Sequence, residues 1–448
     1  MSKININEFI GKSKLNKFHL LMFTLFFLIM TFDGFDMVIY GATLPVLLEQ
    51  FQMNPSQAGF IGSCALIGAA IGALLFGYMA DKIGRKKVII ICTILFSLGS
   101  ILTGFSNTMI TFGIFRFIAG IGLGGVMPNI VSLTTEYAPN KNKAVMVAVI
   151  FSGMQVGGIL ASGLTLWLLK GFGWKVLYII GGFPLLLVPL LLKFLPESAV
   201  NLYKNDHFGA LRTIFSKLQP NAYLPKDVTF ELNDIEKSSV SALFKEKRAR
   251  NTILIWVVFF MNMYMIFGVG TWLPQLMIKA GFGLNFSLLF LLTLNLGALF
   301  GSNIAGLIVE RVGYKNTLVS LYVIAFISIT LLGFTTNLFA VVVLVAFAGI
   351  GFYGGQNVAN GYLSLFYPPS MRSTGMGFAF GLGRFGAIFG PTISGFIVSM
   401  GMDLYVSFLA VSIPGVIAAL AVLTIREGKS TLQSSKNNEM GETEIQLN

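Results

Sequence analysis

Charged residues are scarce in this chain of 448 residues: they make up 11% of it, whereas hydrophobic residues make up 55%. Soluble globular chains contain about 25% charged residues. This deficit excludes an ordinary soluble enzyme of the same length. Uncharged apolar runs of about 20 residues, long enough to cross a bilayer as helices, instead indicate a polytopic membrane protein.

Cysteine and histidine are nearly absent, with two residues of each. Cys64 and Cys92 lie inside apolar runs, cannot build a disulfide framework, and form no spacing typical of metal ligands. His19 and His207 lie outside these runs. We therefore expect no metal, no cofactor and no enzymatic activity. A proton relay within the membrane would have to use carboxylates.

The apolar runs predict an all-α membrane protein with twelve transmembrane helices. We place these spans at residues 20–48, 56–80, 88–105, 110–134, 144–169, 176–195, 251–276, 286–309, 317–334, 338–366, 374–399 and 405–425.

Four regions follow from these spans. We expect an N-terminal six-helix bundle over 1–195, a cytoplasmic linker over 196–250, a C-terminal six-helix bundle over 251–426, and a disordered cytoplasmic tail over 427–448. Within the linker, residues 207–218 bring apolar side chains to helical spacing. They predict a short amphipathic helix on the inner membrane surface.

Basic residues indicate the orientation, because lysine and arginine concentrate in cytoplasmic loops. With the amino terminus inside, 26 of the 31 basic residues fall in inner segments, and only Lys170, Lys175 and Lys279 fall in outer loops. Arg116 and Arg384 lie within spans. Both termini are therefore expected in the cytoplasm of a bacterium, with the chain in its inner membrane and no cleavable signal peptide. The net charge of +12 then reflects topology and not nucleic-acid binding.

An internal repeat relates the two halves at a fixed offset of 229 residues, as from Gly41 to Gly270. The same offset relates Leu44-Pro45 to Leu273-Pro274, Gly77 to Gly306, Asp81 to Glu310, Gly84 to Gly313, residues 119–122 to 348–351, Pro139 to Pro368, and Gly157 to Gly386. Six spans followed by six in the same orientation predict halves related by an axis along the membrane normal. Secondary transporters with this plan bind substrate near mid-membrane between the halves.

Two loops and one helix resemble motifs of the major facilitator superfamily. Residues 77–87, GYMADKIGRKK, are similar to its signature loop, and residues 306–315, GLIVERVGYK, are similar to the second-half copy. Arg116, Gly120 and Gly124 resemble its Arg-xxx-Gly-xxx-Gly motif. The resemblance covers residues 18–425 and implies the twelve-helix fold of that superfamily, with transport by alternating access.

Two further segments resemble the aromatic acid:proton symporter family. They are residues 33–41, DGFDMVIYG, and residues 383–391, GRFGAIFGP. This resemblance implies a proton-coupled symporter, expected to be a monomer, that imports a small benzoate-like carboxylate. Carriers of shikimate, muconate or nicotinate remain alternatives, as does a drug/proton antiporter. Arg384 counts against export of cationic drugs, which favours acidic residues in the cavity without a compensating arginine.

Only Asp33, Asp36, Arg116 and Arg384 place a charge deep in the predicted spans, at a cost of at least about 2.5–3.5 kcal/mol each on insertion scales. Asp33 and Asp36 are three residues apart and share one helical face. Their repulsion in a low dielectric favours retention of a proton by one of them, which suits proton coupling. Alternatively, they pair with a neighbouring arginine or cap a helix break at Gly34. The family resemblance implies that both are needed for transport.

Arg384 lies near mid-membrane among small residues, and its planar guanidinium can bind a carboxylate in two places. We predict that it binds the substrate; an internal ion pair with Asp33 or Asp36 is the alternative. In the repeat, Gln155 occupies the position equivalent to Arg384, and Asn262 occupies the position equivalent to Asp33. Polar side chains in spans also join helices without binding a ligand. The predicted substrate-binding set is Arg384, Gln155, Asn262, Tyr264, Tyr353 and Asn357, chosen from a neighbourhood that also holds Tyr40, Gln356 and Asn360.

Arg116 has three alternative roles: proton coupling, an ion-pair lattice with the first span, or a purely structural role. Glu136 resembles an acidic residue of the family, and we expect it to form a gating ion pair with the cytoplasmic loops. The predicted proton-coupling set is therefore Asp33, Asp36, Arg116 and Glu136. The predicted gate at the inner membrane face consists of Asp81, Arg85, Glu310 and Arg311, for which a topology anchor is the alternative.

Overall fold

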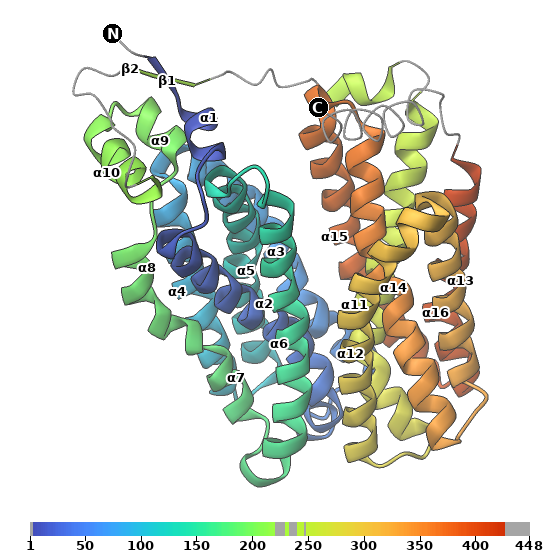
Figure 1. Ribbon diagram of the computed structural model, residues 1–448. Helices are drawn as coiled ribbons and strands as arrows, with labels where there is room; N and C mark the ends of the chain where they lie inside the picture. The colour runs from blue at the N-terminus through green and yellow to red at the C-terminus, as the bar shows by residue number, and fades with distance from the viewer. Residues whose placement is uncertain (1–2, 220–228, 233–239, 246–247, 426–448) are drawn as a thin grey trace.

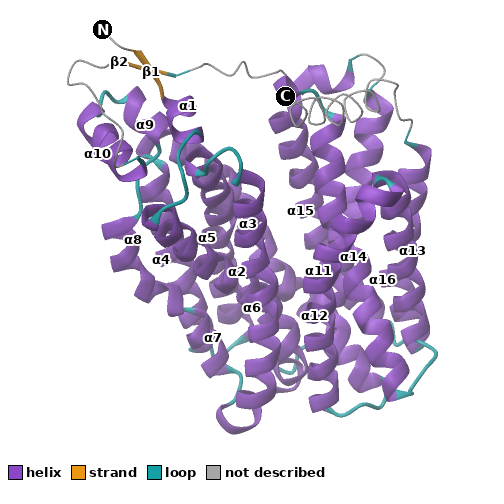
Figure 2. Ribbon diagram, in the orientation of Figure 1, coloured by secondary structure: helices purple, strands orange, loops and turns teal. Residues whose placement is uncertain are grey.

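The computed structural model describes residues 3–219, 229–232, 240–245 and 248–425. Within these residues, twelve helices are long and apolar enough to cross a membrane. They form two bundles side by side (Figure 1), and the loops gather at the two ends of the helices (Figure 2). The predicted all-α fold is confirmed. The predicted disordered tail, 427–448, lies outside the described residues.

The first bundle contains α2 (Lys17–Gln50), α3 (Pro55–Ile83), α4 (Arg85–Gly104), α5 (Met109–Tyr137), α6 (Lys143–Phe172) and a sixth span built from α7 (Lys175–Gly181), η1 (Phe183–Leu187) and α8 (Val188–Phe194). The second contains α11 (Ala249–Lys279), α12 (Leu284–Val312), α13 (Tyr314–Leu332), α14 (Leu338–Phe366), α15 (Pro369–Ser399) and α16 (Leu404–Thr424).

Local sequence signals define several helix ends. Asn54 begins α3 with a capping box, in which its side chain and that of Gln57 each accept a hydrogen bond from the other's backbone N–H, at 2.8 and 3.0 Å. Gly84 and Gly313 follow α3 and α12 with φ of 95° and 83°, a conformation that favours glycine. Because these glycines are equivalent in the repeat, both halves make the same tight turn.

The repeat extends to the packing of the helices. A Cβ on Gly157 of α6 would collide with the carbonyl oxygen of Thr31 on α2, and a Cβ on Gly386 of α15 would collide with that of Phe260 on α11. Both members of the second contact lie 229 residues after those of the first. Glycine at these positions lets the two backbones approach closely, as is common between membrane helices. The helix pairs α2–α6 and α11–α15 are therefore packed in the same register.

A small layer of structure covers the end of the first bundle at which α2 begins. Strand β1 (Lys3–Asn5) pairs in parallel with β2 (Thr229–Glu231), beside α1 (Ile6–Gly11), α9 (Ala199–Lys204) and α10 (Phe208–Leu218); η2 (Val240–Phe244) precedes α11. The expected amphipathic helix is α10. Its Phe215 is fully buried and stacks on Phe9 with ring centroids 4.5 Å apart. The apolar face of α10 is thus packed against the protein itself and is not free to face a membrane.

The two bundles touch near the end opposite the layer that contains α1 and α10. There, Gly41 of α2 lies against the carbonyl of Gly270 on α11, and the hydroxyl of Ser63 on α3 bonds the carbonyl of Ile388 on α15 at 2.6 Å. Toward the predicted cytoplasmic end the ribbons diverge (Figure 1). Consistently, a Cβ on Gly377, in the inner part of α15, would meet no described atom within 4 Å. The bundles are therefore joined on the predicted outer side and separated on the predicted inner side.

Candidate functional site

A buried ion pair joins α2 to α5 in the first bundle. Nη1 of Arg116 donates to Oδ2 of Asp36 at 2.6 Å, and the two side chains are 3% and 1% exposed. Nη2 of Arg116 also approaches the backbone carbonyl of Asp36 at 3.4 Å. Of the alternatives for Asp36, the structure shows pairing with a neighbouring arginine. This pair keeps two opposite charges together where water is excluded.

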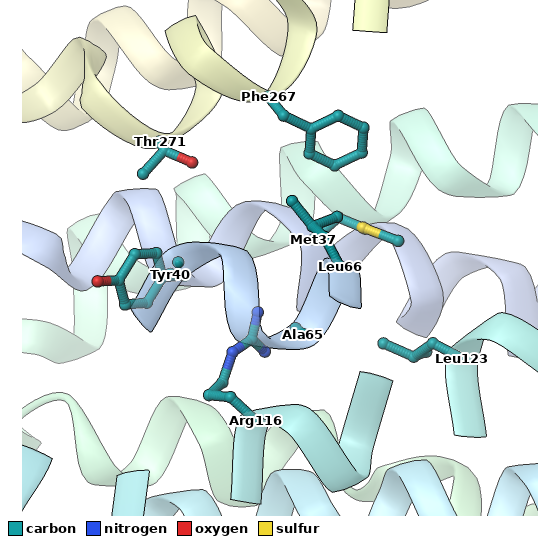
Figure 3. Close-up of a pocket in the computed structure, with 9 residues that line it drawn as sticks. Met37, Tyr40, Ala65, Leu66, Arg116, Leu123, Phe267 and Thr271 are labelled. Atoms are coloured by element: carbon teal, nitrogen blue, oxygen red, sulfur yellow. The ribbon is translucent and has the colours of Figure 1, made fainter. Parts of the chain in front are cut away.

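Two tyrosines flank this ion pair. The guanidinium of Arg116 lies 6.0 Å from the ring centre of Tyr40 and 5.9 Å from that of Tyr178. Arg116 and Tyr40 also line a cavity of about 10 Å³ that Phe267 and Thr271 of the second bundle close (Figure 3). A cavity of this size holds at most about one water molecule. An aromatic acid therefore does not fit at this point in the observed conformation.

Asp33 lies one helical turn before Asp36 but has different surroundings. Its side chain is 2% exposed, and its Oδ1 atom has no hydrogen-bond partner within the described part of the chain. Arg384 of α15 is half-buried and lies close enough to interact electrostatically with Asp33, without an ion pair between them. Asp33 is therefore a buried carboxyl group that faces a cation across the bundle interface and is not neutralised by contact.

Two further predicted residues add unused hydrogen-bonding capacity. The side-chain amide of Asn262 on α11 donates to Oε1 of Gln356 at 2.6 Å, but its own Oδ1 is buried without a partner among the described residues. The same holds for Oε1 of Gln155 on α6. Because Asp33 and Asn262 are related by the repeat, as are Gln155 and Arg384, the four side chains come from equivalent helices of the two bundles. This arrangement suits a central binding site.

The remaining predicted binding residues differ in their surroundings. Tyr264 is buried and Tyr353 is half-buried, whereas Asn357 is exposed. On α14 it is Gln356 that is buried and bonded to Asn262, and its amide also donates to Oδ1 of Asn360 at 2.9 Å. The structure therefore connects Gln356, and not Asn357, to the polar group at the interface.

The predicted gate residues separate into two groups. Arg85 pairs with Glu136 at 2.5 Å, and both belong to the first bundle. Asp81, Glu310 and Arg311 are exposed. The ion pair expected of Glu136 thus forms at the predicted cytoplasmic end but does not cross to the second bundle. Gating by these residues stays a prediction.

Neighbouring polar groups complete the surroundings of Glu136 and Arg85. The hydroxyl of Ser198 and the backbone N–H of Val200 each donate to the Glu136 carboxylate at 3.0 Å. Oε1 of Glu197 accepts from the backbone N–H of Arg85 at 2.7 Å, at the start of α4. The stretch after α8 is therefore tied to the beginning of α4 and the end of α5.

Sequence reasoning missed the roles of Tyr178 and Glu197. Tyr178 approaches Arg116 from α7 and shares a hydrogen bond with Thr43 at 3.1 Å, and no local motif marks it. Glu197 follows the sixth span in the stretch Pro196-Glu197-Ser198, and the sequence alone does not indicate that its carboxylate accepts hydrogen bonds at the start of α4.

Comparison with known proteins places these features in a family. The family model described as Major Facilitator Superfamily matches residues 26–329 and 290–445. The chain is 42% identical over 434 residues to a benzoate transport protein of Acinetobacter baylyi, covering 95% of this chain and 93% of the relative. It is 32% identical to a gallate transporter of Pseudomonas putida, covering 94% of each. Its fold is similar to the inward-open xylose transporter XylE from Escherichia coli, with a TM-score of 0.71, 19% identity, and coverage of 92% of this chain and 97% of that one.

Proposed function

Because this chain belongs to the Major Facilitator Superfamily, a family of multi-pass membrane transporters, we propose that it is a proton-coupled symporter that imports a small aromatic carboxylate. The observation that carries this proposal is the buried, unpaired Asp33 facing Arg384 across the interface between the bundles. The benzoate and gallate transporters among its relatives support an aromatic acid as the substrate.

Asp33 and Arg384 have complementary tasks in this proposal. While Asp33 is ionised, it attracts the guanidinium of Arg384. A proton that binds Asp33 from the outer side removes this attraction and leaves Arg384 free to bind the substrate carboxylate in two places. The Asp36–Arg116 pair holds α2 against α5 throughout. Coupling then follows because Arg384 binds the acid well only when Asp33 holds a proton.

The bundles then rock about the central site. The observed arrangement, joined on the outer side and separated on the predicted cytoplasmic side, suits the step at which acid and proton leave. Loss of the proton from Asp33 restores its attraction for Arg384 and favours release of the acid. The empty carrier then returns to the outward-facing arrangement.

Uptake into proteoliposomes tests this function. The purified chain is reconstituted and offered labelled benzoate, gallate, nicotinate, shikimate and muconate, with and without an inward proton gradient. We expect accumulation of an aromatic acid that requires the gradient and stops when a protonophore is added. Accumulation of shikimate or muconate alone would replace the aromatic assignment, and no gradient-driven uptake of any carboxylate would refute symport.

Variants of Arg384 test the binding site itself. Arg384→Ala should abolish uptake, and Arg384→Lys should raise KM because an ammonium cannot bind a carboxylate through a planar fork. Lys279→Ala, which removes an exposed cation on the predicted outer side, serves as the control and should transport as wild type does. Wild-type uptake by Arg384→Ala would show that the acid binds elsewhere.

A further inference from the structure

A groove of about 370 Å³ lies at the predicted cytoplasmic end of the first bundle, apart from the central site. Its walls come from the starts of α2 and α4, the end of α8 and the stretch that follows it, and from α9 and α10. Phe18 and Phe194 contribute apolar surface, and Lys86, Lys193 and Lys217 contribute three cations. We call this feature the lysine groove. The transport cycle proposed above does not use the lysine groove, and neither Arg85 nor Glu136 of the nearby ion pair lines it.

The charges in the lysine groove favour an anion. Nζ of Lys86 is held by the carbonyl of Leu192 at 2.8 Å, and the ammonium of Lys193 lies 5.2 Å from the ring centre of Phe194. Lys217 of α10 is exposed and lies within electrostatic range of Lys86. These three cations therefore come from separate elements and meet around one cavity.

The single acidic residue in the groove lining is already engaged. Oε1 of Glu197 accepts hydrogen bonds from the backbone N–H groups of Arg85 at 2.7 Å and Ser198 at 2.9 Å. Glu197 also attracts the ammonium group of Lys86 electrostatically, so three lysine charges and one carboxylate charge leave the groove with a net charge of +2. The net positive charge of the lysine groove is therefore left for a ligand.

The surface next to the lysine groove indicates where that ligand comes from. Leu186 in η1 and Leu190 and Leu192 in α8 are 68%, 42% and 57% exposed, so this side of the sixth span presents apolar side chains outward. The groove lies where the span ends, at the depth at which basic residues meet lipid headgroups. We propose that the lysine groove binds the headgroup phosphate of one anionic phospholipid, whose acyl chains lie along this exposed side of η1 and α8.

Lipid binding by the purified full chain tests this proposal. The protein in neutral detergent is titrated with phosphatidylglycerol or phosphatidylcholine, and native mass spectrometry counts the retained lipid. We expect one phosphatidylglycerol to be retained in preference to phosphatidylcholine. Each lysine near an anionic surface contributes about fivefold in affinity, so Lys193→Ala/Lys217→Ala should weaken phosphatidylglycerol binding about 25-fold. Lys170→Ala/Lys279→Ala, with the same change in charge on the predicted outer side, should bind as wild type does.

Three outcomes would overturn the proposal. They are equal retention of both lipids, wild-type retention by Lys193→Ala/Lys217→Ala, and displacement of phosphatidylglycerol by millimolar inorganic phosphate, which would make free phosphate the ligand. The thermal unfolding midpoint of the variant in neutral detergent, without phosphatidylglycerol, should match that of wild type and show that the variant is folded. If that midpoint falls, the wild-type chain is tested at rising ionic strength instead. Retention of phosphatidylglycerol must then weaken as salt screens the lysine charges, and retention that does not change with salt overturns the proposal.

Discussion

Two carboxylates three residues apart on α2 have opposite surroundings. Asp36 is paired with Arg116 at 2.6 Å, whereas Oδ1 of Asp33 is buried without a partner among the described residues. The difference arises because Arg116 comes from the same bundle and Arg384 from the other one. A pair within one bundle can persist while the bundles rock, but a charge that faces the other bundle changes partners when they move. The two aspartates therefore suit different tasks, structural for Asp36 and cycling for Asp33.

Stability measurements distinguish these tasks. Asp36→Asn leaves the guanidinium of Arg116 buried without its counterion, which costs about 3–5 kcal/mol when one member of a buried pair is removed. Asp33→Asn leaves no charge of its own bundle without a counterion and should keep the unfolding midpoint near that of wild type. Thermal unfolding in detergent, followed by size-exclusion chromatography, measures both. Equal losses for the two variants would contradict the assignment.

Transport assays separate the proton from the substrate. If Asp33 carries the proton, Asp33→Asn should lose accumulation driven by a proton gradient but keep counterflow, in which labelled acid outside exchanges for unlabelled acid inside. The amide imitates the protonated carboxyl group and leaves Arg384 free to bind the acid. Counterflow and gradient-driven uptake are measured in the same proteoliposomes. Undiminished accumulation by Asp33→Asn would place the coupling proton on another group.

At the scale of the helices, close approach depends on particular glycines. Gly157→Ala should destabilise the first bundle by about 1–3 kcal/mol, because its Cβ would overlap the carbonyl oxygen of Thr31. Gly163 on the same helix has no described atom within 4 Å of its Cβ position, so Gly163→Ala should be neutral or, through helix propensity, stabilising by up to about 1 kcal/mol. Unfolding midpoints in detergent provide the measurement. A Gly157→Ala variant as stable as Gly163→Ala would show that the two helices can separate at little cost.

Hydrophobic length was enough to predict the spans but not their internal breaks. The second span was expected over 56–80 and is Pro55–Ile83 in the structure. The sixth, expected as one run, is divided into α7, η1 and α8, where Pro184 and Pro189 lack backbone donors. The apolar spacing of α10 predicted a helix with one apolar face but could not indicate what covers that face, because a membrane and a protein surface favour the same pattern.

For the site, the sequence predicted which charged residues matter but not how they pair. The high cost of charge in the membrane singled out Asp33, Asp36, Arg116 and Arg384 without a structure. Which arginine meets which aspartate depends on how α2, α5 and α15 are placed, and sequence spacing contains no such information. Tyr178 was not predicted for the same reason, since its contact with Arg116 is made across helices.

For the whole molecule, transport requires contacts between the bundles that form and break. The contact on the predicted outer side includes small and polar residues beside its apolar ones. Ser63 bonds the Ile388 carbonyl at 2.6 Å and the Thr392 hydroxyl at 2.7 Å, and Oγ of Ser162 accepts from the Asn295 amide at 3.4 Å. Interhelical hydrogen bonds in membranes contribute only about 0.6 kcal/mol on average. Such an interface can hold one conformation and still open during each cycle.

Removal of the Ser63 hydroxyl should therefore shift the balance between the two conformations. Ser63→Ala deletes two bonds between α3 and α15, and at about 0.6 kcal/mol each the outward-open population should rise by up to about eightfold. Ser399→Ala on α15 is the control, since among the described residues that hydroxyl bonds the Phe396 carbonyl of its own helix and no residue of the other bundle. The measurement is the rate at which a membrane-impermeant thiol reagent, added outside, modifies Thr271→Cys in a background without Cys64 and Cys92. Thr271 lines the cavity beneath the outer contact, so faster modification reports opening of that contact, and equal rates in both serine variants would show that these bonds do not hold the outer side closed.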